Sequence, residues 1–322
     1  MAPAAIVTPT PIGEPVKASN GGTLDTSNMG TTRKIICFSD FDGTIFMEDT
    51  GHILFNAYGC GSEQREILDA QIKSGERSFK SVSDEMWGSL DVPFEDGFEA
   101  LKSNLHMDKD FKAFHDFCRN NTIPFNVISA GLKPVLKRVL DEFIGEEAAS
   151  TIDIVSNDAE IDADGHRWKP VWRHQTELGH DKALSINEYR DRAKIESEDG
   201  TIPMIIFIGD GVSDLPAARE ADLLFARRGL ALEEYCVRNR IPYLPYDSFA
   251  DIQREIIRIA TIDQRKTGGQ GLPTNFNPRA NLWRRASSKN AVPVFKAMTP
   301  REERVPEWPE LKGPVAAVQA RG

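Results

Sequence analysis

Two acidic turns in this sequence each follow a short apolar run. The turn at 40–44 reads DFDGT and comes after the run IICF, and the turn at 209–214 reads GDGVSD and comes after PMIIFI. Carboxylates packed together repel one another unless a cation joins them, and hard oxygen ligands favour Mg²⁺. Asp and Gly are also common in solvated turns, so either segment alone could be structural. Together the two turns predict a Mg²⁺ site.

Two other segments carry groups that suit a phosphate. Ser129, Ala130 and Gly131 lie between an apolar run and a helical pattern, so a hydroxyl and main-chain N–H groups would face an anion. Lys182 begins another helical pattern and could hold a phosphoryl oxygen. Singly, an N-cap Ser and a surface Lys are the commoner explanations. In combination with the acidic turns, they predict a phosphate-binding site.

Alternating strands and helices would position these groups. Apolar runs predict five strands, and helical patterns between them predict crossover connections; the strands are expected at 35–38, 125–128, 152–155, 203–208 and 222–226, and the helices at 111–119, 134–143, 181–192 and 214–220. Such alternation is typical of a Rossmann-like α/β core with a parallel sheet covered on both faces. Ligands of such sheets bind beyond the carboxyl ends of the strands.

The chain divides into four parts. Residues 1–32 are rich in Pro, Gly, Ser, Thr and Ala and predict a disordered N-terminal arm, while 33–46 and 106–264 form the core. Residues 47–105 interrupt the alternation with helical pattern and predict an inserted helical cap. Residues 265–322 predict a flexible basic C-terminal tail, with 11 Lys or Arg against 4 Asp or Glu. Ser287 in this tail follows two arginines, as in a basophilic kinase site, but such strings are common by chance.

Composition excludes several classes of protein. The 322 residues are 40% hydrophobic, which suffices for a core, and the net charge of −10 argues against a nucleic-acid binder. No apolar run reaches the ~18 residues of a membrane span. The four cysteines are widely separated and form no CxxC pair, which favours reduced thiols in a cytoplasmic protein.

In their order along the chain, these segments resemble the motifs of haloacid dehalogenase (HAD) superfamily phosphohydrolases. The resemblance covers about residues 34–263 and is to the phosphoserine-phosphatase-like branch, whose small helical cap follows the first motif. It implies that Asp40 is a nucleophile forming an aspartyl-phosphate and that Asp42 is the general acid and base. It also implies that Ser129 and Lys182 bind the phosphoryl group.

The metal site follows from the same resemblance. Asp40, the main-chain carbonyl of Asp42, and Asp210 would bind Mg²⁺, with Asp214 supporting them. The chain departs from phosphoserine phosphatases in having Ser213 where their acidic loop has Asn. It also lacks an Arg at 79–86, where those enzymes bind the serine carboxylate. A phosphorylated amino acid is therefore a disfavoured substrate.

Four further stretches are more similar to fungal polyol (sugar-alcohol) phosphate phosphatases, and also to the methylthio-ketopentenyl phosphate phosphatases of methionine salvage; they are IVSN at 154–157, GHDK at 179–182, GDGVSDL at 209–215 and DLLFARRG at 222–229. A pentitol phosphate is the leading expectation for the substrate. Asp49 stands where relatives place an acid facing the substrate, although capping of a helix is an equal alternative. His180, two residues from Lys182, could line the pocket.

The sequence thus predicts a cytoplasmic, Mg²⁺-dependent phosphomonoesterase that acts on a small phosphorylated metabolite. A regulatory or scaffolding protein of the same fold, using the basic tail to bind an unidentified partner, is the rival from another class. The intact set of acidic, Ser and Lys motifs argues against that rival.

Overall fold

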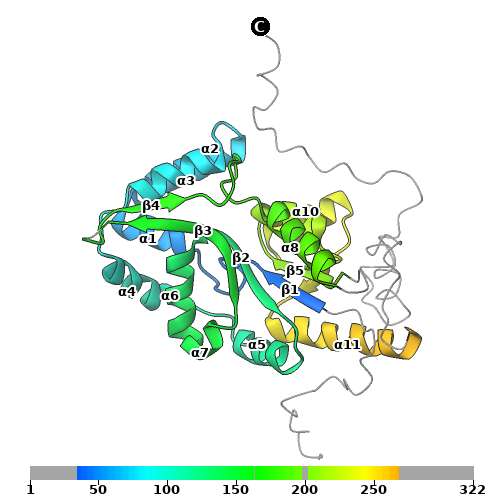
Figure 1. Cartoon of the computed structure of the whole chain (residues 1–322). Helices are drawn as coiled ribbons and strands as arrows, with labels where there is room; N and C mark the ends of the chain where they lie inside the picture. Colours follow the sequence, from blue (N-terminus) through cyan, green and yellow to red (C-terminus); the bar gives the residue numbers. More distant parts are fainter. Residues whose placement is uncertain (1–34, 163, 198–201, 268–322) are drawn as a thin grey trace, which may run out of the picture.

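The computed structural model describes residues 35–162, 164–197 and 202–267 (Figure 1). The predicted N-terminal arm, the predicted tail beyond residue 267, and Ser287 lie outside these ranges. The first three residues assigned to the tail, 265–267, instead end the last helix.

A seven-stranded sheet forms the centre of the molecule, in the order β4-β3-β2-β1-β5-β6-β7. All neighbouring strands are parallel except β3 and β4, which are antiparallel. All five predicted strands are present. The strands are β1 (Ile35–Ser39), β2 (Phe125–Leu132), β3 (Asp153–Ile161), β4 (Trp168–Val171), β5 (Met204–Gly209), β6 (Leu223–Arg227) and β7 (Leu244–Tyr246).

The middle of the sheet is apolar because helices cover both faces. Every residue of β5 and β6 is buried, as the continuous apolar runs predict for strands enclosed on two sides. Helices α8 and α10 lie on one face, and α5 and α11 lie on the other (Figure 1). The helices of the core are α5 (Phe111–Asn120), α6 (Lys133–Ile144), α7 (Glu146–Ala149), α8 (Lys182–Glu196), α9 (Leu215–Glu220), α10 (Ala231–Asn239) and α11 (Phe249–Thr267).

Four helices occupy the segment between β1 and α5, where the sequence predicts a cap. They are α1 (Thr50–Tyr58), α2 (Gly61–Ser74), α3 (Phe79–Gly88) and α4 (Phe94–Asn104). Local signals set their ends: Asp49 and Ser78 cap α1 and α3 through their side chains, and α2 ends at Gly75, whose φ of 75° suits glycine. We call residues 47–105 the helical insertion.

The β3–β4 hairpin carries the sheet out to the helical insertion (Figure 1). Trp168 of β4 is buried, stacks on Trp87 and contacts Phe94, and its Nε1 donates a hydrogen bond to the carbonyl of Val92 at 3.1 Å. Packing of Trp168 therefore joins the hairpin to the insertion.

The loop after the hairpin makes further contacts with the insertion. The indole N–H of Trp172 donates to Asp84 at 2.9 Å, and the N–H of Lys80 donates to the carbonyl of Glu177 at 2.9 Å. Trp172 also covers Gly179, where an added Cβ would lie 2.2 Å from the ring. One loop therefore packs on the insertion and leads directly into α8.

Elements after residue 226 are not among those predicted from the sequence. The strand β7 is only three residues long and contains Pro245, so its pattern is weak. The helices α10 and α11 cover opposite faces of the sheet (Figure 1). No helix in the described ranges has both the length and the apolar character that crossing a bilayer demands.

Candidate active site

Parallel pairing of β1 with β5 brings the two acidic turns together. Ser39 pairs with Ile208, and the N–H of Asp40 donates to the carbonyl of Ile208 at 2.9 Å. Both strands end at the same edge, so Asp40 and Asp210 leave the sheet side by side. Carboxylate oxygens of Asp40, Asp210 and Asp214 all lie within 4.8 Å of one another.

Lys182 lies within this acidic cluster. Its Nζ is 2.8 Å from Asp40 Oδ1 and 2.7 Å from Asp214 Oδ1, and its side chain is 2% exposed. Asp181 caps the helix that Lys182 begins by accepting hydrogen bonds from two main-chain N–H groups. The predicted proximity of the Lys to the acidic turns is therefore present in the structure.

The electrostatics of the cluster are dominated by burial. Burial lowers the pKa of Lys182, but Asp214 and Asp40 outweigh it, so the pKa is raised and the ammonium stays charged. Burial, with help from Asp214, raises the pKa of Asp40 despite the opposing effect of Lys182. Burial and Asp214 raise the pKa of Asp210 to about 7. Lys182 thus pairs with two of the three carboxylates, Asp40 and Asp214.

The donor set fits a hard divalent cation. Asp214 uses both oxygens already, since Oδ1 accepts from Lys182 and Oδ2 accepts from the N–H groups of Asp210 and Gly211. Asp40 and Asp210 each use one oxygen, Oδ1, for hydrogen bonds or ion pairs with described residues. The free oxygens of Asp40 and Asp210 suit a metal, whereas both oxygens of Asp214 are already engaged by described residues.

Gly43 and Thr44 fix the position of Asp210. Gly43 has a φ of 77°, and an added Cβ would lie 2.3 Å from Asp210 Oδ2, so both the turn and the close approach require glycine. Thr44 Oγ1 donates to Asp210 Oδ1 at 2.8 Å. The DFDGT sequence therefore supplies Asp40 to the cluster and also fixes the position of Asp210.

The side chain of Asp42 forms a hydrogen bond with the helical insertion. Its Oδ1 accepts a hydrogen bond from the N–H of Thr50, the first residue of α1, at 2.8 Å. Burial, followed by the charge of Asp49, raises the pKa of Asp42 to about 8. Asp49 itself accepts from the N–H of His52 at 2.8 Å, which is the helix-capping alternative considered for this residue.

The predicted phosphate loop follows the middle of β2. Ser129 is buried, and its Oγ accepts a hydrogen bond from the N–H of Gly131 at 3.0 Å. The ladder between β2 and β3 is irregular from Ile128 to Leu132, so Ser129, Ala130 and Gly131 bulge out of regular pairing. The strand continues to Leu132 rather than stopping at Ser129.

His180 is not placed as a pocket-lining side chain. It is 3% exposed, and its two ring nitrogens bond to the Ser129 carbonyl at 2.6 Å and to Ser185 Oγ at 2.9 Å. Burial lowers its pKa to about 3, so the ring is neutral. The structure places it beside the phosphate loop, bonded to protein groups through both nitrogens.

Arg227 is a positioning residue to which sequence reasoning gives no role. Its guanidinium donates to the carbonyl of Thr44 at 2.6 Å and pairs with buried Asp108 at 2.9 Å. It thereby holds the turn whose hydroxyl orients Asp210. An Arg at the end of an otherwise apolar strand is the signal that could have identified it, because a buried charge requires partners.

Comparison with known proteins agrees with this geometry. The family of haloacid dehalogenase-like hydrolases matches residues 37–219. The chain belongs to this family. It is 37% identical over 220 residues to the polyol phosphate phosphatase PYP1 of Saccharomyces cerevisiae, which covers 68% of this chain and 91% of the relative. The protein is a phosphatase.

Other relatives widen the comparison. The Pdp3-interacting factor 1 of Schizosaccharomyces pombe is 34% identical, covering 72% of this chain and 98% of its own length. A 2-hydroxy-3-keto-5-methylthiopentenyl-1-phosphate phosphatase of Bacillus cytotoxicus is 26% identical, covering 70% and 97%. A phosphoserine phosphatase structure, a phospho-aspartyl intermediate analogue, superposes with a TM-score of 0.52 at 16% identity, covering 69% and 99%, and shows the shared fold.

Asp210→Asn tests whether the buried negative charge of Asp210 lowers the stability of the folded protein. A folded-state pKa of about 7 against an ordinary 3.8 means that stability falls as pH rises from about 4 to about 7, and that the whole cost is present at pH 8. Without added metal at pH 8, the variant should melt about 2–5 °C higher than wild type, as expected for one or two kcal/mol relieved. Scanning calorimetry of both proteins measures this difference in melting temperature.

Added Mg²⁺ provides the counterpart of that measurement. It should raise the melting temperature of wild type and leave Asp210→Asn nearly unchanged, because the variant has lost a ligand. A variant that melts lower than wild type without metal, or that responds equally to Mg²⁺, contradicts the metal-site interpretation.

Proposed function

We propose that the protein hydrolyses the phosphate monoester of a small metabolite in a Mg²⁺-dependent reaction through an aspartyl-phosphate on Asp40. The observation that carries the proposal is the buried cluster in which Lys182 contacts Asp40 and Asp214 beside Asp210. Phosphoryl transfer needs mainly alignment and neutralisation of charge, and this cluster offers both.

The reaction has two balanced steps. An oxygen of Asp40 forms a bond to phosphorus while the ester oxygen leaves and takes a proton from the carboxyl group of Asp42. The Asp42 carboxylate then removes a proton from water, whose oxygen attacks phosphorus and breaks the acyl-phosphate bond. Inorganic phosphate leaves, and Asp40 and protonated Asp42 are restored.

The surrounding groups have matching tasks. Lys182 and the hydroxyl and N–H groups of the Ser129 loop would hold phosphoryl oxygens. Mg²⁺, held by Asp40, the carbonyl of Asp42 and Asp210, would supply positive charge opposite the attacking carboxylate and the phosphate. A pKa of about 8 keeps Asp42 protonated at neutral pH, which suits a general acid.

A polyol phosphate, specifically a pentitol phosphate, is the substrate that we favour. The yeast relative, whose name refers to polyol phosphates, supports this broader class. Helix α3 contains no Arg to bind a substrate carboxylate, and Asp49 near Asp42 offers an acceptor for hydroxyl groups. The Bacillus relatives make a methylthio-ketopentenyl phosphate the alternative.

The helical insertion is proposed to act as the cap that selects this substrate, over a core of residues 33–46 and 106–264. Contacts of Thr50 with Asp42 and of Trp168 with the insertion support this division. A cytoplasmic location is also proposed, since all four cysteines are free thiols.

Binding of a protein partner is a second candidate function. It is favoured by the name of the S. pombe relative, which refers to interaction with another protein. Such a function would not require the buried Lys182 and carboxylate cluster, so this candidate ranks below catalysis.

Hydrolysis of p-nitrophenyl phosphate, with Mg²⁺ and with EDTA, tests the proposal directly. Wild type should be active only with the metal, and Asp40→Asn should lose at least ~10³-fold while its circular dichroism spectrum is retained. A panel of pentitol, keto-sugar and amino-acid phosphates then ranks substrates by kcat/KM. If hydrolysis survives in Asp40→Asn, or if wild type shows none, partner binding becomes the favoured function.

Asp49→Asn tests the source of the raised pKa of Asp42. The charge of Asp49 favours the protonated form of Asp42, so removing that charge should move the alkaline limb of the kcat/KM profile to lower pH. Asn keeps the helix cap, which limits effects on folding. The profile is recorded with p-nitrophenyl phosphate, and a limb that stays in place or moves upward contradicts this assignment.

A further inference from the structure

Two consecutive carbonyl groups of the Ser129 loop are bonded to buried polar side chains. The ring nitrogen Nδ1 of His180 lies 2.6 Å from the carbonyl oxygen of Ser129, and Nδ2 of Asn157 donates to the carbonyl oxygen of Ala130 at 2.7 Å. Asn157 has no exposed surface, and His180 is 3% exposed. A carbonyl oxygen only accepts, so His180 Nδ1 carries the proton.

These two bonds fix the direction of the peptide planes. In a trans peptide the C=O and the following N–H point in opposite directions. The N–H groups of Ala130 and Gly131 therefore point away from His180 and Asn157. The N–H of Gly131 donates to Ser129 Oγ, which leaves the proton of that hydroxyl available to a phosphoryl oxygen.

A second layer of bonds fixes the two side chains in turn. Since Nδ1 of neutral His180 carries the proton, Nε2 accepts from the hydroxyl of Ser185. Arg173 joins both branches, because its Nε donates to Ser185 Oγ at 3.0 Å and its main-chain N–H donates to Asn157 Oδ1 at 3.0 Å. Each polar atom has one role compatible with its neighbours.

The network also links the loop to the buried cation. His180 precedes Lys182 by two residues, and Ser185 lies on the first turn of α8, which Lys182 begins. The segment that holds the Ser129 carbonyl therefore also carries the ammonium group that contacts Asp40. A displacement of the loop relative to Lys182 would break bonds to His180.

We infer that His180 and Asn157 are positioning residues that hold the Ser129–Ala130–Gly131 main chain so that the Ser129 hydroxyl and the N–H of Ala130 face the phosphoryl group at a fixed place relative to Lys182. This inference rests on the proposed function, and it replaces the expectation that His180 contacts substrate. The two side chains act through the loop, without touching the reacting atoms.

Two substitutions at residue 180 separate positioning from simple burial. The side-chain amide of Asn can place a donor where Nδ1 lies, and that of Gln reaches only the place of Nε2. With p-nitrophenyl phosphate, His180→Asn should keep kcat/KM within about threefold, whereas His180→Gln should lose about 10- to 100-fold, as for loss of a supporting hydrogen bond at a site. Inhibition by inorganic phosphate should weaken in His180→Gln alone.

Asn157→Asp tests the second bond by the same logic. The carboxylate can still accept from the N–H of Arg173, but it presents an acceptor to the Ala130 carbonyl. The kcat/KM should fall by about 10- to 100-fold. Equal activity of the Asn and Gln variants at 180, or full activity of Asn157→Asp, overturns the inference.

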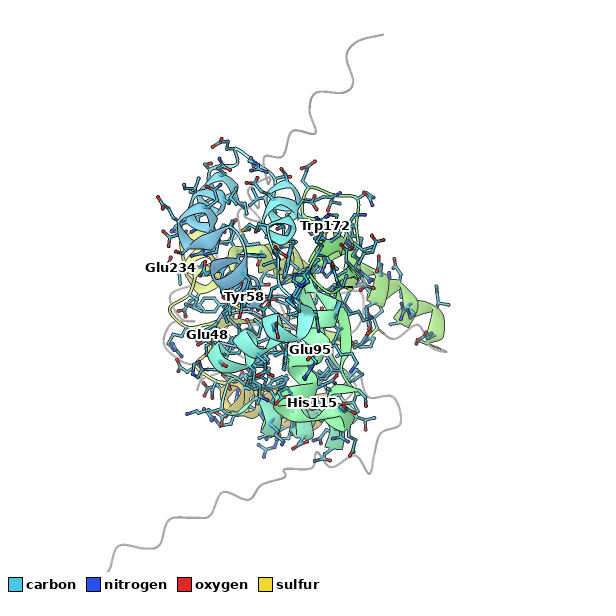
Figure 2. The ribbon with its side chains drawn as sticks, turned by 90° about the vertical axis from the view of Figure 1, so that its left-hand side faces the viewer. Glu48, Tyr58, Glu95, His115, Trp172 and Glu234 are labelled. Carbon is cyan, nitrogen blue, oxygen red and sulfur yellow. The ribbon has the colours of Figure 1, made fainter. Side chains whose placement is uncertain are left out.

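His115→Asn is the matched control for disturbing a buried histidine, because Asn does not reach the place of Nε2, through which His115 bonds. His115 is buried on α5, where its Nε2 lies 3.1 Å from Thr151 Oγ1, and Figure 2 shows it in the lower part of the molecule, with Trp172 in the upper part. This variant should lower the melting temperature without changing kcat/KM. If it lowers kcat/KM as His180→Gln does, the loss is structural and the inference fails.

The outcomes distinguish this inference from the proposed function. Absence of activity in wild type would contradict the proposed function. The rise in melting temperature on adding inorganic phosphate with Mg²⁺ would then test whether the loop still binds phosphate. Wild type and His180→Asn should be stabilised, and His180→Gln should not. An active wild type matched by an equally active His180→Gln defeats the positioning role alone.

Discussion

The buried ion-pair cluster around Lys182 is the interaction on which the architecture depends. Removing one ammonium and several carboxylates from water costs several kcal/mol per ion, and the fold recovers this only through close contacts and hydrogen bonds. Asp214 uses both oxygens in this way, towards Lys182 and towards two main-chain N–H groups. The remaining excess of negative charge lies on Asp40 and Asp210, where a metal ion and a phosphate would meet.

The parallel sheet makes this concentration of charge possible. Neighbouring strands β1 and β5 end together, so residues 170 positions apart in the sequence become adjacent. Close packing then keeps these carboxylates from moving apart. A side chain at position 43 would collide with Asp210, so glycine is required there, and Arg227 donates a hydrogen bond to the carbonyl of Thr44. The charged cluster at the carboxyl edge of the sheet lowers the stability of the fold, and the buried apolar side chains at the centre of the sheet compensate for it.

Much of this arrangement could be predicted from sequence because it depends on local pattern. The apolar runs before Asp40 and Asp210 define buried strands, and their carboxyl ends define where ligands bind. The strand β7 could not be predicted, since three residues with a central Pro have no readable period. The role of His180 was also beyond sequence: its bond to the Ser129 carbonyl joins residues 51 positions apart, and only the tertiary structure shows which face of the loop it occupies. The Arg227–Asp108 pair was hidden for the same reason.

The central claim is that Asp40 becomes covalently phosphorylated. Rapid acid quench of the enzyme during turnover of p-nitrophenyl phosphate with Mg²⁺, followed by peptide mass spectrometry, tests it most directly. Phosphate is expected on the peptide containing Asp40, at Asp40 itself, with more of it in Asp42→Asn because water is no longer activated. Phosphate on another residue, or none in an enzyme that is turning over, would show that Asp40 is not the nucleophile.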